Sequence, residues 1–104
     1  MDIGNTIIFL RKQQGLSQKK LAELTGISAN ALCNIEKGYS FPSKENIKAI
    51  CFSLNIPTAY LLLKSLTEDD IPKEKLPVFK ALQKPMLELF EKEELYGMER
   101  DTKR

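Results

Sequence analysis

The run LSQKKLAELTGISANALCNIEKGYSFPS, residues 16–43, has the pattern of two short helices joined by a tight turn. Ser17 and Ser28 are typical N-cap residues, and each is followed by apolar residues at helical spacing. Gly26 supplies the backbone freedom to end the first helix and redirect the chain, while small Ala22 allows a close approach. The residues placed to fix the crossing angle are Leu21, Ile27, Leu32 and Ile35. The stretch therefore predicts two helices held in one fixed geometry.

Glycine and proline divide the flanking sequence at helix-sized intervals. We expect a helix over 2–14 that ends at Gly15, a helix capped by Ser43 that runs to Leu54, and a short helix over 58–63. No segment alternates apolar and polar residues over the length of a strand, so no sheet is predicted. The fold class is all-α, with five helices in a domain over residues 1–66.

Residues 67–104 differ from the preceding residues in composition and pattern, and they form a C-terminal extension. An acidic link leads to Pro72, and from about Lys75 apolar residues recur at helical spacing. Pro85 lies in the interior of this helix, so we expect a kink or break near residues 83–84. The last residues, 97–104, are expected to fray.

The charge is unevenly distributed along the chain, although the formal net charge is only +2. Residues 1–66 carry eight basic and four acidic side chains, which leaves +4, and residues 67–104 carry eight basic and ten acidic, which leaves −2. The balance suits an anion-binding module with an appended segment of different role, and an ordinary solvated surface would give the same balance.

The composition weighs against an enzyme and against a metal site. The chain has no histidine and no C-x-x-C pair, so we expect no zinc site and no cofactor. Cys33 and Cys51 each lie in a helical apolar pattern and are interpreted as small buried hydrophobes. The N-terminal apolar run is interrupted by Arg11 and Lys12, and no stretch reaches membrane-spanning length. We therefore expect a cytoplasmic protein with no membrane partner.

The stretch 16–43 resembles the phage-repressor and Cro family of helix-turn-helix regulators, also called the XRE family. The resemblance covers residues 3–63 and is carried by Leu16-Ser17-Gln18, Leu21-Ala22, Gly26-Ile27-Ser28, Ile35-Glu36-Lys37-Gly38 and Pro42-Ser43. It implies a five-helix, lambda-repressor-like DNA-binding domain, followed here by a C-terminal helical extension. It also implies that residues 29–37 form the recognition helix, which lies in the major groove.

The resemblance assigns roles to individual residues. The positions that face base edges are Ser28, Ala29, Asn30 and Asn34; an asparagine amide can bind adenine through two hydrogen bonds. Plain solvated helix residues are the alternative interpretation of the two asparagines. The positions that meet the DNA backbone are Gln18, Lys19, Lys37, Lys44 and Arg11. Arg11 and Glu36 are also expected to form a structural ion pair.

Regulators of this class usually bind DNA as two-fold dimers, because one recognition helix reads only a few base pairs. The residues expected to form the dimer interface are Leu62, Leu66, Leu76, Phe79, Leu82, Met86, Leu89 and Phe90. Packing within one chain is the second interpretation of this apolar stripe, and a small-molecule sensor is the third.

The function expected from these observations is a sequence-specific transcriptional regulator that binds an inverted repeat of double-stranded DNA as a homodimer and acts as a repressor. The alternative is an antitoxin-like protein whose C-terminal tail binds a partner protein. The two are compatible, because antitoxins of this fold often repress their own operon.

Overall fold

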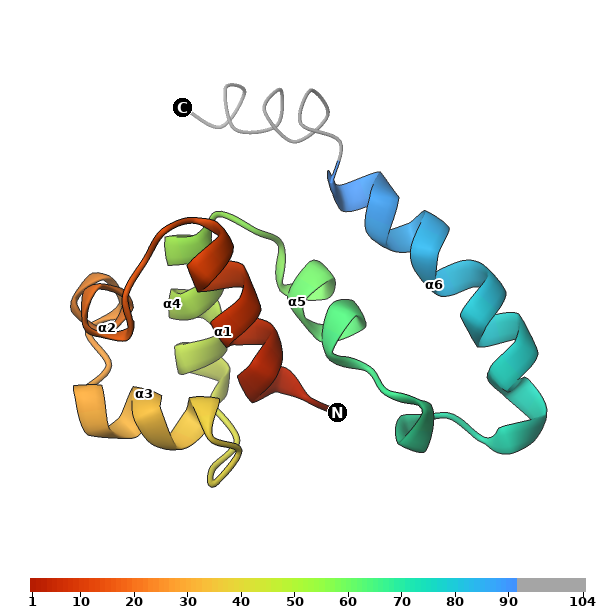
Figure 1. Ribbon diagram of the computed structural model, residues 1–104, viewed down its shortest axis with the longest axis horizontal. Helices are drawn as coiled ribbons and strands as arrows, with labels where there is room; N and C mark the ends of the chain where they lie inside the picture. The colour runs from red at the N-terminus through yellow and green to blue at the C-terminus, as the bar shows by residue number, and fades with distance from the viewer. Residues whose placement is uncertain (92–104) are drawn as a thin grey trace. The chain divides into compact units, whose positions relative to one another are not determined.

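The computed structural model describes residues 1–91, and every regular element within them is helical (Figure 1). The predicted all-α fold class is confirmed. The chain divides into two compact units, residues 1–67 and residues from 68 onward. Among the described helices no single one is long and apolar enough to cross a bilayer; α4 and α5 pass that test only as a pair bent by 103°.

The first unit contains the five expected helices. They are α1 (Ile3–Gln13), α2 (Gln18–Thr25), α3 (Ala29–Glu36), α4 (Lys44–Leu54) and α5 (Thr58–Ser65). The ends of α2 and α4 agree with the prediction, while α5 continues past Leu63, where the prediction ended it. In its last turn the Ser65 hydroxyl donates a hydrogen bond to the Leu61 carbonyl oxygen at 2.7 Å. This local bond satisfies a buried polar side chain, which apolar spacing does not reveal.

Serine side chains set the start of three helices. The hydroxyl oxygens of Ser17, Ser28 and Ser43 accept hydrogen bonds from backbone N–H groups three residues further on, at 3.0, 3.0 and 3.1 Å. Each bond satisfies a donor that the first helical turn leaves without a partner. These caps explain why the starts of α2, α3 and α4 follow directly from the sequence.

The core of the first unit draws on all five helices. The large apolar side chains that are completely covered are Ile7, Leu21, Leu32, Ile50, Leu54 and Leu61. Helix α1 packs on α2, α3 and α5, and α2 packs on both α3 and α4 (Figure 1). Because α3 is held from two sides, its position relative to α2 is fixed by the core.

Gly4 marks the closest approach of α1 to α3. It is buried, and a Cβ atom added there would lie 2.6 Å from the carbonyl oxygens of both Ile35 and Glu36. No side chain fits at that distance, so glycine is required by packing although it weakens a helix. The contact sets α1 directly against the C-terminal end of α3.

The second unit begins with two short 3₁₀ turns, η1 (Glu68–Asp70) and η2 (Lys73–Lys75), and continues as α6 (Leu76–Glu91). Lys80 of α6 forms an exposed ion pair with Glu68, at 3.0 Å. No described residue of α6 is buried.

The sequence predicts a kink or a break near residues 83–84; the break is wrong, because α6 is continuous with Pro85 inside it, and the kink stays a prediction. Proline removes one backbone donor, and the remaining hydrogen bonds of a sixteen-residue helix suffice to carry the chain past it. The fraying expected for residues 97–104 lies outside the described residues.

Candidate nucleic-acid interface

The turn between α2 and α3 is closed by local hydrogen bonds. Gly26 has a left-handed backbone (φ 76°), and its N–H donates to the Ala22 carbonyl oxygen. The Thr25 hydroxyl donates to the Leu21 carbonyl oxygen at 2.9 Å and accepts the N–H of Ile27 at 3.2 Å. The Ile27 side chain is buried below the turn. These contacts hold α3 at one angle to α2, as a surface that reads a rigid duplex requires.

Helix α3 exposes its N-terminal end. Ser28, Ala29 and Asn30 are exposed, and Asn34, one turn further along, is half-buried. On the opposite face, Leu32 and Ile35 are buried. The structure therefore places Ser28, Ala29 and Asn30 together at the exposed start of α3, with Asn34 one turn further along and partly covered.

A buried ion pair joins α1 to the end of α3. The Arg11 Nε atom lies 2.7 Å from Glu36 Oε2, and Arg11 Nη2 lies 2.9 Å from Glu36 Oε1, so the pair is bidentate. The two side chains are only 11% and 2% exposed. Arg11 Nη1 also donates to the Leu16 carbonyl oxygen, at 3.2 Å. The hydrogen bond to Glu36 raises the pKa of Arg11, which keeps the guanidinium charged.

Gln18, the first residue of α2, belongs to the same network. Its amide nitrogen donates to Glu36 Oε1 at 2.9 Å, the oxygen that also accepts from Arg11 Nη2. Glu36 thus connects three helices through one carboxylate. No buried side-chain nitrogen or oxygen in residues 1–91 lacks a partner, so the cost of burying the two charges is offset by complete hydrogen bonding.

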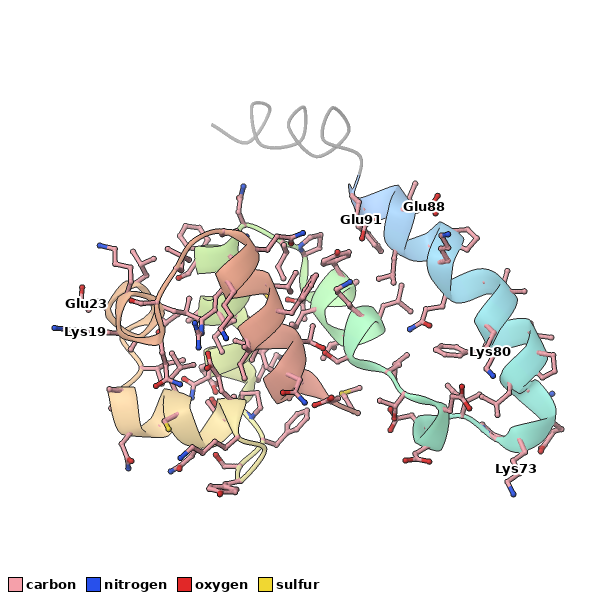
Figure 2. The ribbon with its side chains drawn as sticks, viewed as in Figure 1. Lys19, Glu23, Lys73, Lys80, Glu88 and Glu91 are labelled. Carbon is pink, nitrogen blue, oxygen red and sulfur yellow. The ribbon has the colours of Figure 1, made fainter. Side chains whose placement is uncertain are left out.

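The other residues expected at the DNA backbone lie on the surface. Lys19, Lys37 and Lys44 are exposed, and Figure 2 shows Lys19 pointing away from the core of its unit. Gln18 is half-buried and Arg11 is buried. Arg11 therefore faces Glu36, and its influence on a bound phosphate would be exerted through the position of Gln18.

Two aromatic residues near α3 were missed by the sequence interpretation. Tyr39 and Phe41, in the loop between α3 and α4, are 76% and 62% exposed. The Lys37 ammonium lies 5.9 Å from the centre of the Tyr39 ring. A signal for them was present in the sequence. Two aromatic residues stand in a turn between Gly38 and Pro42, and a turn has no regular face that packs on the core.

The expected dimer-interface residues are distributed over both units. Leu62 and Leu66 are half-buried in the first unit; in α6, Leu76, Phe79 and Phe90 are half-buried and Leu82, Met86 and Leu89 are exposed. Val78, which the prediction omitted, is also exposed.

The two cysteines differ in burial. Cys51 is buried, and burial raises the pKa of its thiol, whereas Cys33 is only half-buried. Among the described residues no group of three or more side chains could hold a metal ion.

Two helices joined by a short hydrogen-bonded turn, with the second helix exposing its N-terminal end, define a helix-turn-helix domain. The helix-turn-helix family matches residues 7–61, more than half of the chain, and the chain belongs to this family. The predicted resemblance to XRE-type regulators is confirmed.

Three curated relatives show what the chain is similar to. The competence pilus inhibition repressor of Acinetobacter baylyi is 33% identical over 72 residues, which cover 66% of this chain and 64% of the relative. Antitoxin PezA of Streptococcus pneumoniae is 43% identical over 54 residues, 52% of this chain and 34% of the relative. The regulator SutR of Escherichia coli is 38% identical over 55 residues, which cover 53% of this chain and 31% of the relative. The chain thus spans less than two thirds of each relative.

Proposed function

We propose that this protein is a sequence-specific, double-stranded DNA-binding transcriptional regulator that acts in the cytoplasm as a repressor, by binding and not by catalysis. The observation that carries the proposal is the exposed N-terminal end of α3, with Ser28, Ala29 and Asn30, on a helix whose other face is locked into the core. Relatives named as a repressor and as a transcriptional regulator support it.

In this proposal α3 enters the major groove and α2 crosses the DNA backbone. The Asn30 amide offers a donor and an acceptor together, which matches the edge of adenine, and Ala29 offers a methyl group to thymine. The N-terminus of α2, with Gln18 held by Glu36, and the exposed lysines Lys19, Lys37 and Lys44 bind phosphates. The excess of basic side chains in residues 1–66 also favours binding to the phosphates of DNA.

The proposed active form is a homodimer that binds an inverted repeat. Val78, Leu82, Met86 and Leu89 are exposed, and their spacing of three or four residues puts them on one face of α6. An exposed apolar stripe of this length is typical of a helix that packs on a partner. A second copy is the simplest partner, because two-fold symmetry would bring two α3 helices to successive half-sites, about 10 base pairs apart.

Asn30→Ala is expected to relax sequence recognition. On a duplex selected by the wild-type protein, affinity should fall by about five- to 150-fold, since one bidentate base contact is worth about 1–3 kcal/mol. Binding to random duplex should change little, because phosphate contacts remain. Fluorescence anisotropy with both duplexes measures the ratio of the affinity for the selected duplex to the affinity for random duplex. An equal loss on both duplexes would show that Asn30 does not read a base.

The double substitution Leu82→Ser and Leu89→Ser is expected to convert a dimer into a monomer in sedimentation experiments at tens of micromolar, because both changes put a hydroxyl on the apolar face of α6. Ala81→Ser, on the same helix and also exposed, is the matched control and should stay dimeric. A wild-type protein that sediments as a monomer at this concentration would contradict the dimer.

A second candidate function is that of an antitoxin whose extension binds a partner protein. It is favoured by the relative named antitoxin PezA and by the exposed stripe of α6. In this case the reading frame next to the gene should encode a small toxin-like protein. The variant with both Leu82→Ser and Leu89→Ser would then no longer bind that toxin-like protein, and its affinity for DNA would be unchanged.

A further inference from the structure

The loop between α3 and α4 displays aromatic surface that the first unit does not use for its core. Tyr39 and Phe41 are among the most exposed large hydrophobic side chains of the described residues. Exposed aromatic rings lose the favourable free energy of burial, and they are enriched where a surface binds another molecule. The position of these two rings, directly after the proposed recognition helix, calls for an explanation.

The backbone of this loop is held in place. The N–H groups of Tyr39 and Ser40 both donate to the Asn34 carbonyl oxygen, at 2.9 and 3.4 Å, and the Gly38 N–H donates to the Ile35 carbonyl oxygen at 3.1 Å. Gly38 takes the left-handed conformation (φ 81°) that starts the turn. At the other end Pro42 is buried. Because both ends are anchored, the rings are presented with little backbone entropy left to lose on binding.

Lysine residues stand at both ends of the loop in the sequence. The Lys37 ammonium lies 5.9 Å from the Tyr39 ring centre, Lys44 follows the loop, and no acidic residue occurs between them. Apolar rings in a loop with an ammonium group beside Tyr39 and a second lysine at its end match a polymer in which apolar sugars alternate with anionic phosphates. A protein partner with a plain apolar patch would gain nothing from the flanking lysines.

The position of the loop agrees with this chemistry. Helix α3 has eight residues, so it is about 12 Å long, which is about the width of the major groove. A helix that points across the groove therefore brings the segment after its C-terminus to the backbone that borders the groove.

We propose that Tyr39 and Phe41 pack against the deoxyribose rings of the DNA strand that borders the major groove, with Lys37 bound to the adjacent phosphate. The inference rests on the proposed DNA-binding function. It adds a contact between aromatic side chains and deoxyribose that strengthens binding to any duplex. Recognition of the base sequence remains the role of α3.

The absence of tryptophan from the sequence provides a direct test. Tyr39→Trp places a single tryptophan on the loop, and its emission, excited selectively, should shift or be quenched when duplex DNA is added. Phe52→Trp, at an α4 residue that is 87% exposed, is the matched control and should not respond. An unchanged Tyr39→Trp spectrum in a protein that still binds the duplex would overturn the inference and leave the proposed function standing.

Affinity measurements complete the test. Tyr39→Ala and Phe41→Ala should each weaken binding by about five- to ten-fold, on selected and random duplexes alike, because sugar contacts carry no sequence information. Their melting temperatures should match the wild type, since neither ring is in the core. Full affinity in both variants, or a loss confined to the selected duplex, would overturn the inference. Failure of the wild-type protein to bind any duplex would overturn the proposed function itself.

Discussion

Glu36→Gln is expected to lower the stability of the protein and its affinity for DNA together. The substitution keeps the shape of the side chain and removes the negative charge that balances buried Arg11. Loss of one partner from a buried ion pair costs about 3–5 kcal/mol, because the remaining charge stays desolvated. Thermal unfolding followed by circular dichroism measures this loss.

The loss of affinity follows from the shared oxygen. Glu36 Oε1 accepts from both Arg11 and Gln18. A neutral amide at residue 36 has one oxygen, which is a weaker acceptor, and an NH2 group that cannot accept from Arg11, so it holds Gln18 less tightly at the start of α2. The matched control is Glu23→Gln, on exposed α2 surface (Figure 2), which should change neither quantity by much. Equal melting temperatures and equal affinities in wild type and Glu36→Gln would contradict the positioning role of this pair.

Gly4→Ala is expected to destabilise the first unit by about 3 kcal/mol, at the upper end of the cost of overpacking a core. In an unhindered helix the same change would stabilise by about 1 kcal/mol, so the sign of the effect isolates the steric clash. The clash involves the carbonyl oxygens of Ile35 and Glu36, and backbone atoms cannot rotate away. Helix α3 would have to move relative to α1, so DNA affinity should fall as well.

The control for Gly4→Ala is Lys12→Ala, a change to alanine at an exposed residue of the same helix. It should leave the free energy of urea-induced unfolding within about 0.5 kcal/mol of the wild-type value. A Gly4→Ala protein as stable as this control would mean that α1 and α3 can separate without cost.

The helices of the first unit could be predicted because their signals are local. Ser17, Ser28 and Ser43 cap helices through bonds within one turn, and Gly26 ends α2 through its own backbone angle. Such signals need no knowledge of the rest of the fold. The resemblance to the XRE family added the pair of Arg11 with Glu36, which lie 25 residues apart and which no local rule connects.

The features that escaped prediction depend on what surrounds a residue. Gly4 looks like an ordinary weak position in a helix, and only the approach of α3 shows why a side chain cannot fit. Pro85 was expected to disrupt its helix, yet α6 continues through it. The exposure of Tyr39 and Phe41 escaped prediction because hydropathy alone does not say whether a ring in a turn faces the core or the solvent.

The central claim is that α3 reads a DNA sequence, and selection of binding sites from a random duplex pool by the purified wild-type protein tests it most directly. The account predicts enrichment of an inverted repeat whose half-sites lie about 10 base pairs apart. Recovery of no common sequence, with only weak binding that disappears as salt is raised, would contradict it.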